Sequence, residues 1–340
     1  MSGLRTIVIG FGQVASGLSK DARMATYFEY ASHASVLAAH PAFDWQGVVD
    51  PDPAAQADAR DTWGISHAGA DLQKVIDLVR PEIAVLACPP GMRADAVAAM
   101  PDLKAVLLEK PLDTPGDHDD GKGLERLCSE RRIPVLVNYW RRADDLFRSL
   151  AAGGLSERIG EVQSVTGFYG NGLANNGSHL IDFMRMLLGD VVALQALSPA
   201  TPAAKAPLRD DIHVPFSLMF ADGAVTSVHP LDFRHYREVG LDIWGTEGRL
   251  SILQEGLVTT VFPLTENRGL TGEKEIASDA GEVLDTTVSD AFYRMYDNLA
   301  DIANSRADAW SPLASALLNE RIIGLIHESA DKGCARLTLG

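Results

Sequence analysis

The chain has 340 residues, of which 46 are acidic and 30 are basic, and its formal net charge is −16. Such an excess of acidic residues argues against a nucleic acid partner, because phosphate binding needs clustered Lys and Arg. The hydrophobic content of 46% is typical of a globular protein, and no apolar run approaches the ~20 residues that span a bilayer. We therefore expect no membrane partner, and the length suggests two domains.

The cysteines and the start of the chain indicate the compartment. Cys88, Cys128 and Cys334 are widely separated and form no Cys-x-x-Cys pair, so reduced thiols are the simple interpretation. The chain enters an apolar strand-like run almost at once, which leaves no room for a signal peptide. These features predict a cytoplasmic protein.

The most informative segment is the first predicted strand, Thr6–Ile9, together with the residues after it. They read Gly-Phe-Gly-Gln-Val-Ala, the pattern G-x-G-x-x-A, and a helix is expected to begin near Gly12. After a strand and before a helix, this pattern indicates dinucleotide binding. Gly10 makes the tight turn, Gly12 lets the main chain approach a pyrophosphate, and Ala15 lets the helix pack closely. The predicted cofactor-binding residues of this segment are Gly10, Phe11, Gly12, Gln13 and Val14.

Asp50 ends the second predicted strand, Trp45–Val49. An acidic side chain there accepts hydrogen bonds from the adenosine ribose and repels a 2′-phosphate. The usual spacing is ~20 residues, whereas Asp50 stands 40 residues after the first glycine. An apparent insertion at Ser19–Tyr30, before a helix expected at His33–Ala39, accounts for much of the excess. The alternative is a turn aspartate before a proline. Because no Lys or Arg occurs from 51 to 59, we expect NAD rather than NADP.

Strands and helices continue to alternate up to about residue 140, which predicts an α/β fold with a doubly wound parallel sheet. Two apolar strands, Ile83–Ala87 and Ala105–Leu108, are followed by Cys88-Pro89-Pro90 and Glu109-Lys110-Pro111. The other expected elements are helices at Asp71–Val79, Ala94–Ala99 and Leu124–Glu130 and a strand at Pro134–Tyr139.

Lys110 comes directly after a buried strand, at the carboxyl edge of the predicted sheet, where doubly wound folds bind their ligands. An ammonium there can hydrogen-bond a substrate hydroxyl and stabilise a developing alkoxide. The alternative is a solvated lysine at a strand end. We predict cofactor contacts from Pro89, Glu109 and Lys110.

The second half of the chain changes character. Turn signals at Asp222-Gly223 and Glu247-Gly248 separate strand-like runs, which predicts a large, mostly antiparallel sheet. Apolar residues occur at both alternations of these strands, so we expect a homodimer or homotetramer built through the outer face of the sheet. The strands are expected at Val214–Phe220, Ala224–His229, Val239–Trp244 and Arg249–Leu253, with helices at Ser178–Leu188, Asp290–Asn304 and Pro312–Ala330.

These elements divide the chain into two domains. We expect a dinucleotide-binding domain over residues 1–140. Residues 141–340 are expected to form a substrate-binding and oligomerisation domain, whose last helix is a candidate for returning to the first domain.

Asn175, His179 and Asp182 are spaced i, i+4 and i+7, so on a helix they share one face. A histidine in the first turn of a helix is held neutral and is ready to accept a proton. The alternative is a structural histidine, with Asn175 as a helix cap and Asp182 solvated. We predict His179 and Lys110 as catalytic and Asn175, Asp182 and Tyr169 as substrate-binding. The remaining histidines show no metal-binding spacing, so no metal is expected.

Together these motifs resemble those of the glucose–fructose oxidoreductase / inositol dehydrogenase / MocA (Gfo/Idh/MocA) family over nearly the whole chain. The resemblance rests most on Leu-Glu-Lys-Pro-Leu at 108–112 and Gly-Ser-His-Leu-Ile-Asp at 177–182. It implies an N-terminal Rossmann domain and a C-terminal α/β domain with a large, mostly antiparallel sheet. It also implies a nicotinamide cofactor and a polyol, sugar or sugar-derivative substrate.

The resemblance further implies that Lys110 lies beside substrate and nicotinamide and that His179 is the acid/base. Two positions depart from the family pattern. Asn175 stands where family members often carry an aspartate, and an amide cannot relay a proton. Arg93 stands where they often carry a histidine.

We therefore expect an NAD-dependent oxidoreductase that transfers a hydride between nicotinamide and a secondary alcohol or ketone of such a substrate. A non-catalytic NAD-binding regulator or sensor of the same fold is one alternative, because fold does not determine function. NAD-dependent glycoside cleavage or imine reduction on the same scaffold is another.

Overall fold

The computed structural model describes residues 3–113, 120–204 and 206–339, and the chain forms two compact units. Unit 1 consists of Met1–Ala143 and Ser289–Leu317, and unit 2 consists of Asp144–Val288 and Leu318–Gly340. Unit 1 thus combines the N-terminal part of the chain with a later stretch. None of the helices among the described residues is both long enough and apolar enough to cross a membrane.

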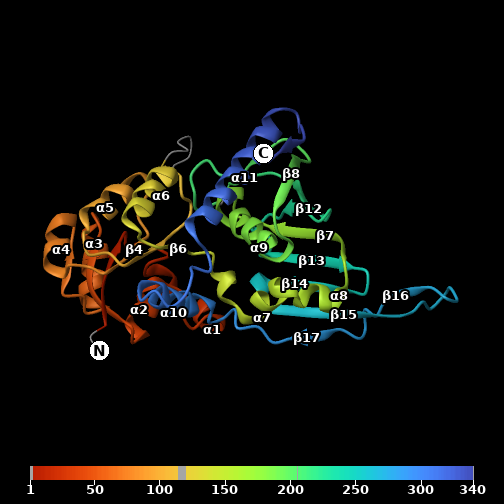
Figure 1. Ribbon diagram of the computed structural model, residues 1–340, viewed down its shortest axis with the longest axis horizontal. Coiled ribbons are helices and arrows are strands. Elements are labelled where there is room, and N and C mark those ends of the chain that lie inside the picture. Colours follow the sequence, from red (N-terminus) through yellow and green to blue (C-terminus); the bar gives the residue numbers. More distant parts are fainter. Residues whose placement is uncertain (1–2, 114–119, 205, 340) are drawn as a thin grey trace. The chain divides into compact units, whose positions relative to one another are not determined.

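A six-stranded sheet is the frame of unit 1, and Figure 1 labels its strands β4 and β6. The strand order is β3-β2-β1-β4-β5-β6, and all neighbouring strands are parallel. This order reverses direction between β1 and β4, which is the point where open α/β sheets bind their ligands. The predicted doubly wound parallel sheet is confirmed. Its strands are β1 (Leu4–Ile9), β2 (Phe43–Val49), β3 (His67–Gly69), β4 (Ile83–Leu86), β5 (Ala105–Leu108) and β6 (Val135–Val137).

Several helices of unit 1 begin at side-chain caps. The Ser32 hydroxyl accepts the Ser35 N–H at the start of α2, and the Asp71 carboxylate accepts the Lys74 N–H at the start of α4. The helices are α1 (Met24–Tyr27), α2 (His33–Ala39), α3 (Pro53–Asp61), α4 (Leu72–Val79), α5 (Arg93–Ala99), α6 (Asp120–Arg131) and α10 (Ala291–Ala303).

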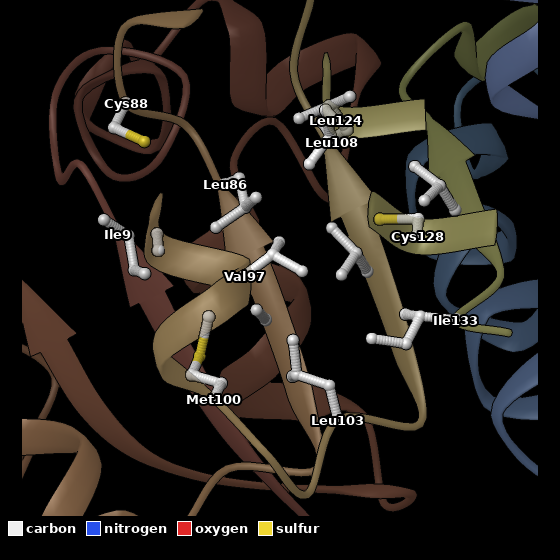
Figure 2. Packing of buried hydrophobic residues seen from close by; sticks show 14 of the residues in the cluster. Ile9, Leu86, Cys88, Val97, Met100, Leu103, Leu108, Leu124, Cys128 and Ile133 are labelled. Atoms are coloured by element: carbon white, nitrogen blue, oxygen red, sulfur yellow. The ribbon is translucent and has the colours of Figure 1, made fainter. Parts of the chain in front are cut away.

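The two faces of this sheet belong to separate apolar cores. Leu86 and Leu108 pack with side chains from α4, α5 and α6, and Figure 2 shows part of this core. Their strand neighbours Val85 and Leu107 point the other way and pack with side chains from α2 and α10. Because both faces are buried, these strands are continuous apolar runs in the sequence.

The prediction of an α-helix that begins near Gly12 is wrong. A turn and the short 3-10 helix η1 (Gly17–Lys20) follow the glycines instead. Nevertheless, the Ala34 N–H in the first turn of α2 donates to the Ala15 carbonyl at 2.8 Å, as in a continuing helix. The segment 16–32 is therefore an insertion that interrupts the first helix. It is rich in Ser and Gly near its start, where helix propensity is low, and the Ser32 cap restarts the helix.

Unit 2 is built on a ten-stranded sheet in which β7 and β12 are parallel and the other pairs are antiparallel, as predicted for a large, mostly antiparallel sheet. Along the main path, its order is β16-β15-β14-β13-β7-β12-β11-β8-β18, and β17 pairs with β15. The strands are β7 (Val162–Tyr169), β8 (Val191–Ala196), β11 (Phe216–Phe220), β12 (Val225–Pro230), β13 (Gly240–Gly245), β14 (Gly248–Leu253), β15 (Val258–Glu266), β16 (Lys274–Ile276), β17 (Glu282–Leu284) and β18 (Leu337–Thr338).

Helices cover the buried face of this sheet. Leu180 of α9 lies against Gly167 of β7, and the rings of Phe183 in α9 and Phe147 in α7 are 4.6 Å apart. The other elements of unit 2 are α7 (Asp145–Ser149), α8 (Leu155–Ile159), α9 (Ser178–Leu188) and the two-residue strands β9 (Thr201–Pro202) and β10 (Ile212–His213), while α11 (Leu313–Asp331) is divided between the units.

The opposite face of the sheet is mixed in character. Ser217 and Asp242 occupy it beside Met219 and Trp244, all at least partly accessible, so it is not the second apolar face that we expected. Arg249 makes a two-point ion pair with Asp242, at 2.7 and 2.6 Å, and its guanidinium lies 4.6 Å from the Trp244 ring centroid. This face therefore carries both an ion pair and a contact between a cation and an aromatic ring.

All three cysteines are free thiols. Cys88 and Cys128 are buried in the core shown in Figure 2, whereas Cys334 is partly exposed. Burial raises the pKa of Cys128 to about 11. Because the thiolate is the reactive form, burial makes Cys128 a packing residue.

Candidate active site

The glycine turn lies at the carboxyl end of β1. Gly10 has φ +85°, and a Cβ there would lie 2.7 Å from main-chain atoms of Ala87 and Cys88, so the turn needs glycine both for its conformation and for its close approach to β4. At Gly12, by contrast, an added Cβ would meet no atom within 4 Å. The main chain at Gly12 is thus open to a ligand.

Asp50 is joined to this turn. Its carboxylate accepts the Phe11 N–H at 2.6 Å and the Asp52 N–H at 2.8 Å. The second bond is the local turn expected of an aspartate before a proline, while the first fixes the carboxylate beside the glycine turn. Asp50 is therefore a turn aspartate that also lies beside the glycine turn, and its binding of a ribose stays a prediction. Gln56 of α3 adds a third bond, donated to the Asp50 carbonyl at 2.8 Å.

Arg93 ties together the loops that follow β4 and β5. This buried side chain donates from Nε to the Cys88 carbonyl at 3.0 Å and from Nη1 to the Pro111 carbonyl at 2.7 Å. The guanidinium therefore holds the two segments that carry Pro89 and Lys110 in one arrangement. Arg93 was noted in the sequence as a departure from the family pattern, and its clamping position is a property that only the structure reveals.

The Glu-Lys-Pro motif divides between interior and surface. Lys110 is partly exposed at the end of β5, whereas Glu109 is buried. The Glu109 carboxylate forms hydrogen bonds with one imidazole and one side-chain amide of unit 1. His33 Nε2 lies 3.0 Å and Asn138 Nδ2 lies 2.6 Å from Oε1. Its predicted contact with a cofactor therefore competes with these interior partners.

In unit 2, the predicted residues lie in and before α9. Asn175 belongs to η5 (Leu173–Gly177), the one-turn π-helix that leads into α9, and His179 is the second residue of α9, partly exposed. Tyr169 is fully buried, its hydroxyl donates to the Val214 carbonyl at 2.8 Å, and burial raises its pKa. A substrate role for Tyr169 would require that bond to break.

Asp182 points into unit 2. It is 2% exposed, so the alternative of a solvated helix residue is wrong. Its carboxylate accepts Asn319 Nδ2 at 2.9 Å, and the Asn319 side-chain oxygen in turn accepts Arg185 Nη1 at 2.7 Å. This chain of bonds holds α9, the helix that carries His179, against α11.

Asp211 is a further residue near His179 that no sequence motif predicts. Its buried carboxylate accepts the main-chain N–H groups of Ala174 and Asn175, both at 3.0 Å, and of Ile212 at 2.8 Å. It thus anchors the segment immediately before His179. No local pattern marks Asp211, since it bonds to a segment 36 residues earlier in the chain.

The residues of unit 1 fit a dinucleotide. The open main chain at Gly12 suits a pyrophosphate, and a carboxylate oxygen has more than one acceptor position, so Asp50 can bond a ribose hydroxyl while keeping its main-chain partners. Among the described residues, no three His, Cys, Asp or Glu side chains are grouped to hold a metal ion.

Comparison with known proteins agrees with this arrangement. The model of the oxidoreductase family with an NAD-binding Rossmann fold matches residues 4–139, and the model of the GFO/IDH/MocA C-terminal domain matches residues 167–251. A search of curated proteins finds no match.

Many solved structures share the fold. An inositol dehydrogenase homolog from Azotobacter vinelandii, complexed with NADH and myo-inositol, is 13% identical with a TM-score of 0.74, covering 99% of this chain and 98% of that chain. The WlbA dehydrogenase from Bordetella pertussis, in complex with NADH and UDP-GlcNAcA, is 18% identical with a TM-score of 0.72, covering 99% of both chains. An oxidoreductase from Pseudomonas syringae is 14% identical with a TM-score of 0.75, covering 99% of both chains.

A parallel six-stranded dinucleotide-binding domain followed by a large, mostly antiparallel sheet defines the class as a two-domain NAD(P)-dependent oxidoreductase. The chain belongs to the Gfo/Idh/MocA oxidoreductase family.

Proposed function

We propose that the protein transfers a hydride between NAD and a secondary alcohol or ketone of a sugar, sugar derivative or polyol. One observation carries the proposal: the Gly10–Gly12 turn and Lys110 follow β1 and β5 at the same carboxyl edge of one sheet, separated only by β4. This is the edge where such sheets bind ligands. The relatives crystallised with myo-inositol and UDP-GlcNAcA support this substrate class.

The proposed roles follow from the chemistry of each group. Gly10–Val14 and Asp50 hold NAD, which when bound supplies the hydride-accepting and hydride-donating chemistry. A ring nitrogen of His179 accepts the proton of the substrate hydroxyl as the alcohol is oxidised. The Lys110 ammonium donates a hydrogen bond to the developing alkoxide and stabilises its charge. In the reduction direction, His179 returns the proton to the same oxygen.

A screen of polyols, sugars and sugar nucleotides by NADH fluorescence tests the proposal. Steady NADH formation with one class supports it. Cofactor binding without turnover on any class would instead favour an NAD-binding regulator. Release of a free sugar without net NAD consumption would favour glycoside cleavage.

We expect NADH to bind at least ~10-fold more tightly than NADPH, because like charges brought together cost more than the ~1.4 kcal/mol that a tenfold ratio requires. The Asp50 carboxylate would face the 2′-phosphate, and the following stretch 51–59 contains no cation. Fluorescence titration with both reduced cofactors measures the ratio, and Asp50→Asn should narrow it. Tighter binding of NADPH to the wild type would contradict the role of Asp50.

Asn175→Asp should change the pH profile and the substrate preference more than cofactor binding. Asn175 lies one turn before His179, so a carboxylate there favours the protonated imidazole, and we expect the acid limb of the activity profile to move up by ~1 pH unit. The wild type should tolerate an acidic or phosphorylated ligand, such as a uronic acid or a sugar nucleotide, better than the variant. An unchanged profile and preference would make Asn175 a helix cap only.

A homo-oligomer, most simply a dimer through the mixed face of the unit 2 sheet, stays a prediction. Trp244 and Met219 on that face support it, although Asp242 and Arg249 already satisfy each other there. Light scattering at micromolar concentration measures the state, and a monomer would contradict this prediction. A cytoplasmic location is likewise proposed, supported by the three free thiols.

A further inference from the structure

Glu109 is a buried carboxylate placed immediately before the proposed catalytic Lys110. The residue is 6% exposed, and a carboxylate is found in such a place only when hydrogen bonds or opposite charges compensate its lost hydration. The two side chains that bond to this carboxylate come from different segments of unit 1. They therefore decide how the end of β5 is held.

Two side chains bond directly to Glu109. His33, the first residue of α2, has Nε2 at 3.0 Å from Oε1, and Asn138, directly after β6, donates from Nδ2 to the same oxygen at 2.6 Å. Both partners are buried. The carboxylate thus joins the first helix after the insertion to the ends of two neighbouring strands.

A third side chain orients the histidine. His33 Nδ1 lies 2.7 Å from the Tyr296 hydroxyl of α10. Burial, helped by the charge of Glu109, raises the pKa of Tyr296 well above its ordinary value, so this hydroxyl keeps its proton and is a hydrogen-bond partner for Nδ1. Because an ionised carboxylate only accepts hydrogen bonds, the bond between Nε2 and Glu109 is donated by the ring.

The charge of Glu109 is preserved in this setting. Burial is the largest single influence and favours the neutral acid, but the hydrogen bond and charge of His33, the hydrogen bond from Asn138 and the charge of Lys110 together lower the pKa of Glu109. Attraction between two charges is mutual, so the carboxylate stabilises the Lys110 ammonium in turn. The groups facing Glu109 are His33 from α2, Tyr296 from α10, the neutral Asn138 amide and Lys110 itself.

We propose that Glu109, anchored by His33, Asn138 and Tyr296, is a positioning residue that holds the Lys110 ammonium at the carboxyl edge of the sheet. The network then sets both the place and the charge of the group that meets the substrate oxygen. The proposal rests on the proposed function for the purpose of Lys110, while the anchoring is a property of unit 1 alone.

Trace labelling with acetic anhydride over a range of pH, read by peptide mass spectrometry, gives the titration midpoint of each lysine without any substrate. In Glu109→Gln, we expect the Lys110 midpoint to fall by ~1 pH unit or more. Lys104, at the other end of β5, pairs with Glu82 at 2.7 Å and serves as an internal reference. The matched variant Glu82→Gln removes a carboxylate at the opposite end of β5 and should leave the Lys110 midpoint unchanged.

If Glu109 has only a structural role, the Glu109→Gln variant will have a lower melting temperature but an unchanged Lys110 midpoint. An unchanged midpoint in a folded Glu109→Gln variant would overturn the proposal. If circular dichroism shows that this variant does not fold, Tyr296→Phe decides, since it removes only the hydroxyl that orients His33. A smaller fall of the Lys110 midpoint supports the proposal, and no change overturns it. Normal turnover in Lys110→Ala would refute the proposed function and leave the labelling result standing.

Discussion

Lys110→Ala and His179→Ala should each lower kcat by ~10²–10⁴-fold, the usual loss when general acid–base help is removed. The first variant removes the ammonium that stabilises the alkoxide, and the second removes the proton acceptor. NADH affinity should stay close to that of the wild type, because the glycine turn and Asp50 are intact. Steady-state kinetics on the substrate found by the screen, together with NADH titration, measures both quantities.

Matched controls come from the same residue types elsewhere in the chain. Lys104 precedes β5 at its amino end, and His229 is an exposed residue of β12, so Lys104→Ala and His229→Ala should keep wild-type turnover. If His179→Ala also keeps wild-type turnover, another residue acts as the catalytic base. Tyr169 is then a poor substitute, because its buried hydroxyl both donates to the Val214 carbonyl and accepts the Val214 N–H.

Substitution of the two glycines of the turn should have different effects, one on stability and the other on cofactor binding. Gly10→Ala should lower the free energy of unfolding by ~2–4 kcal/mol, because a positive φ and a main-chain clash both oppose the new methyl group. The distance to main-chain atoms of Ala87 and Cys88 would be only 2.7 Å. Gly12→Ala should change stability by no more than ~0.5 kcal/mol but weaken NADH binding at least ~10-fold, since its methyl group fills only the space open to the ligand.

Urea unfolding and NADH titration of both variants separate these outcomes. Equal loss of stability in the two would mean that Gly12 also serves the fold. Unchanged NADH affinity in a folded Gly12→Ala would mean that no pyrophosphate approaches the main chain there. Either result would remove the main physical support for the predicted cofactor site.

Local sequence signals predicted much of the fold. The bounds expected for His33–Ala39, Ala105–Leu108 and Ser178–Leu188 are those observed, because apolar runs or helical periodicity lie between clear turn and cap residues. The missed helix α3 (Pro53–Asp61) has little apolar periodicity. Its signal was the Asp52 cap followed by proline at the first helical position.

The interrupted first helix shows where such signals fail. The G-x-G-x-x-A pattern predicts a helix at Gly12, but α2 supplies that helix after the insertion, as the Ala34 to Ala15 main-chain bond demonstrates. The pattern reflects the requirements of the turn and of close approach by a ligand, both of which depend on residues near in sequence. Which later segment continues the helix is decided by packing against the sheet.

The sequence by itself determined most of the elements, the parallel sheet of the first domain and the residue types that carry the chemistry, because these depend on neighbours along the chain. Only the tertiary structure decided which side chains serve as anchors. Glu109 meets His33, which is 76 residues away, and Asp211 meets Asn175, which is 36 residues away. Periodicity assigns a side chain to a face, but contacts between distant segments decide whether that face is buried and which charge or donor it meets there.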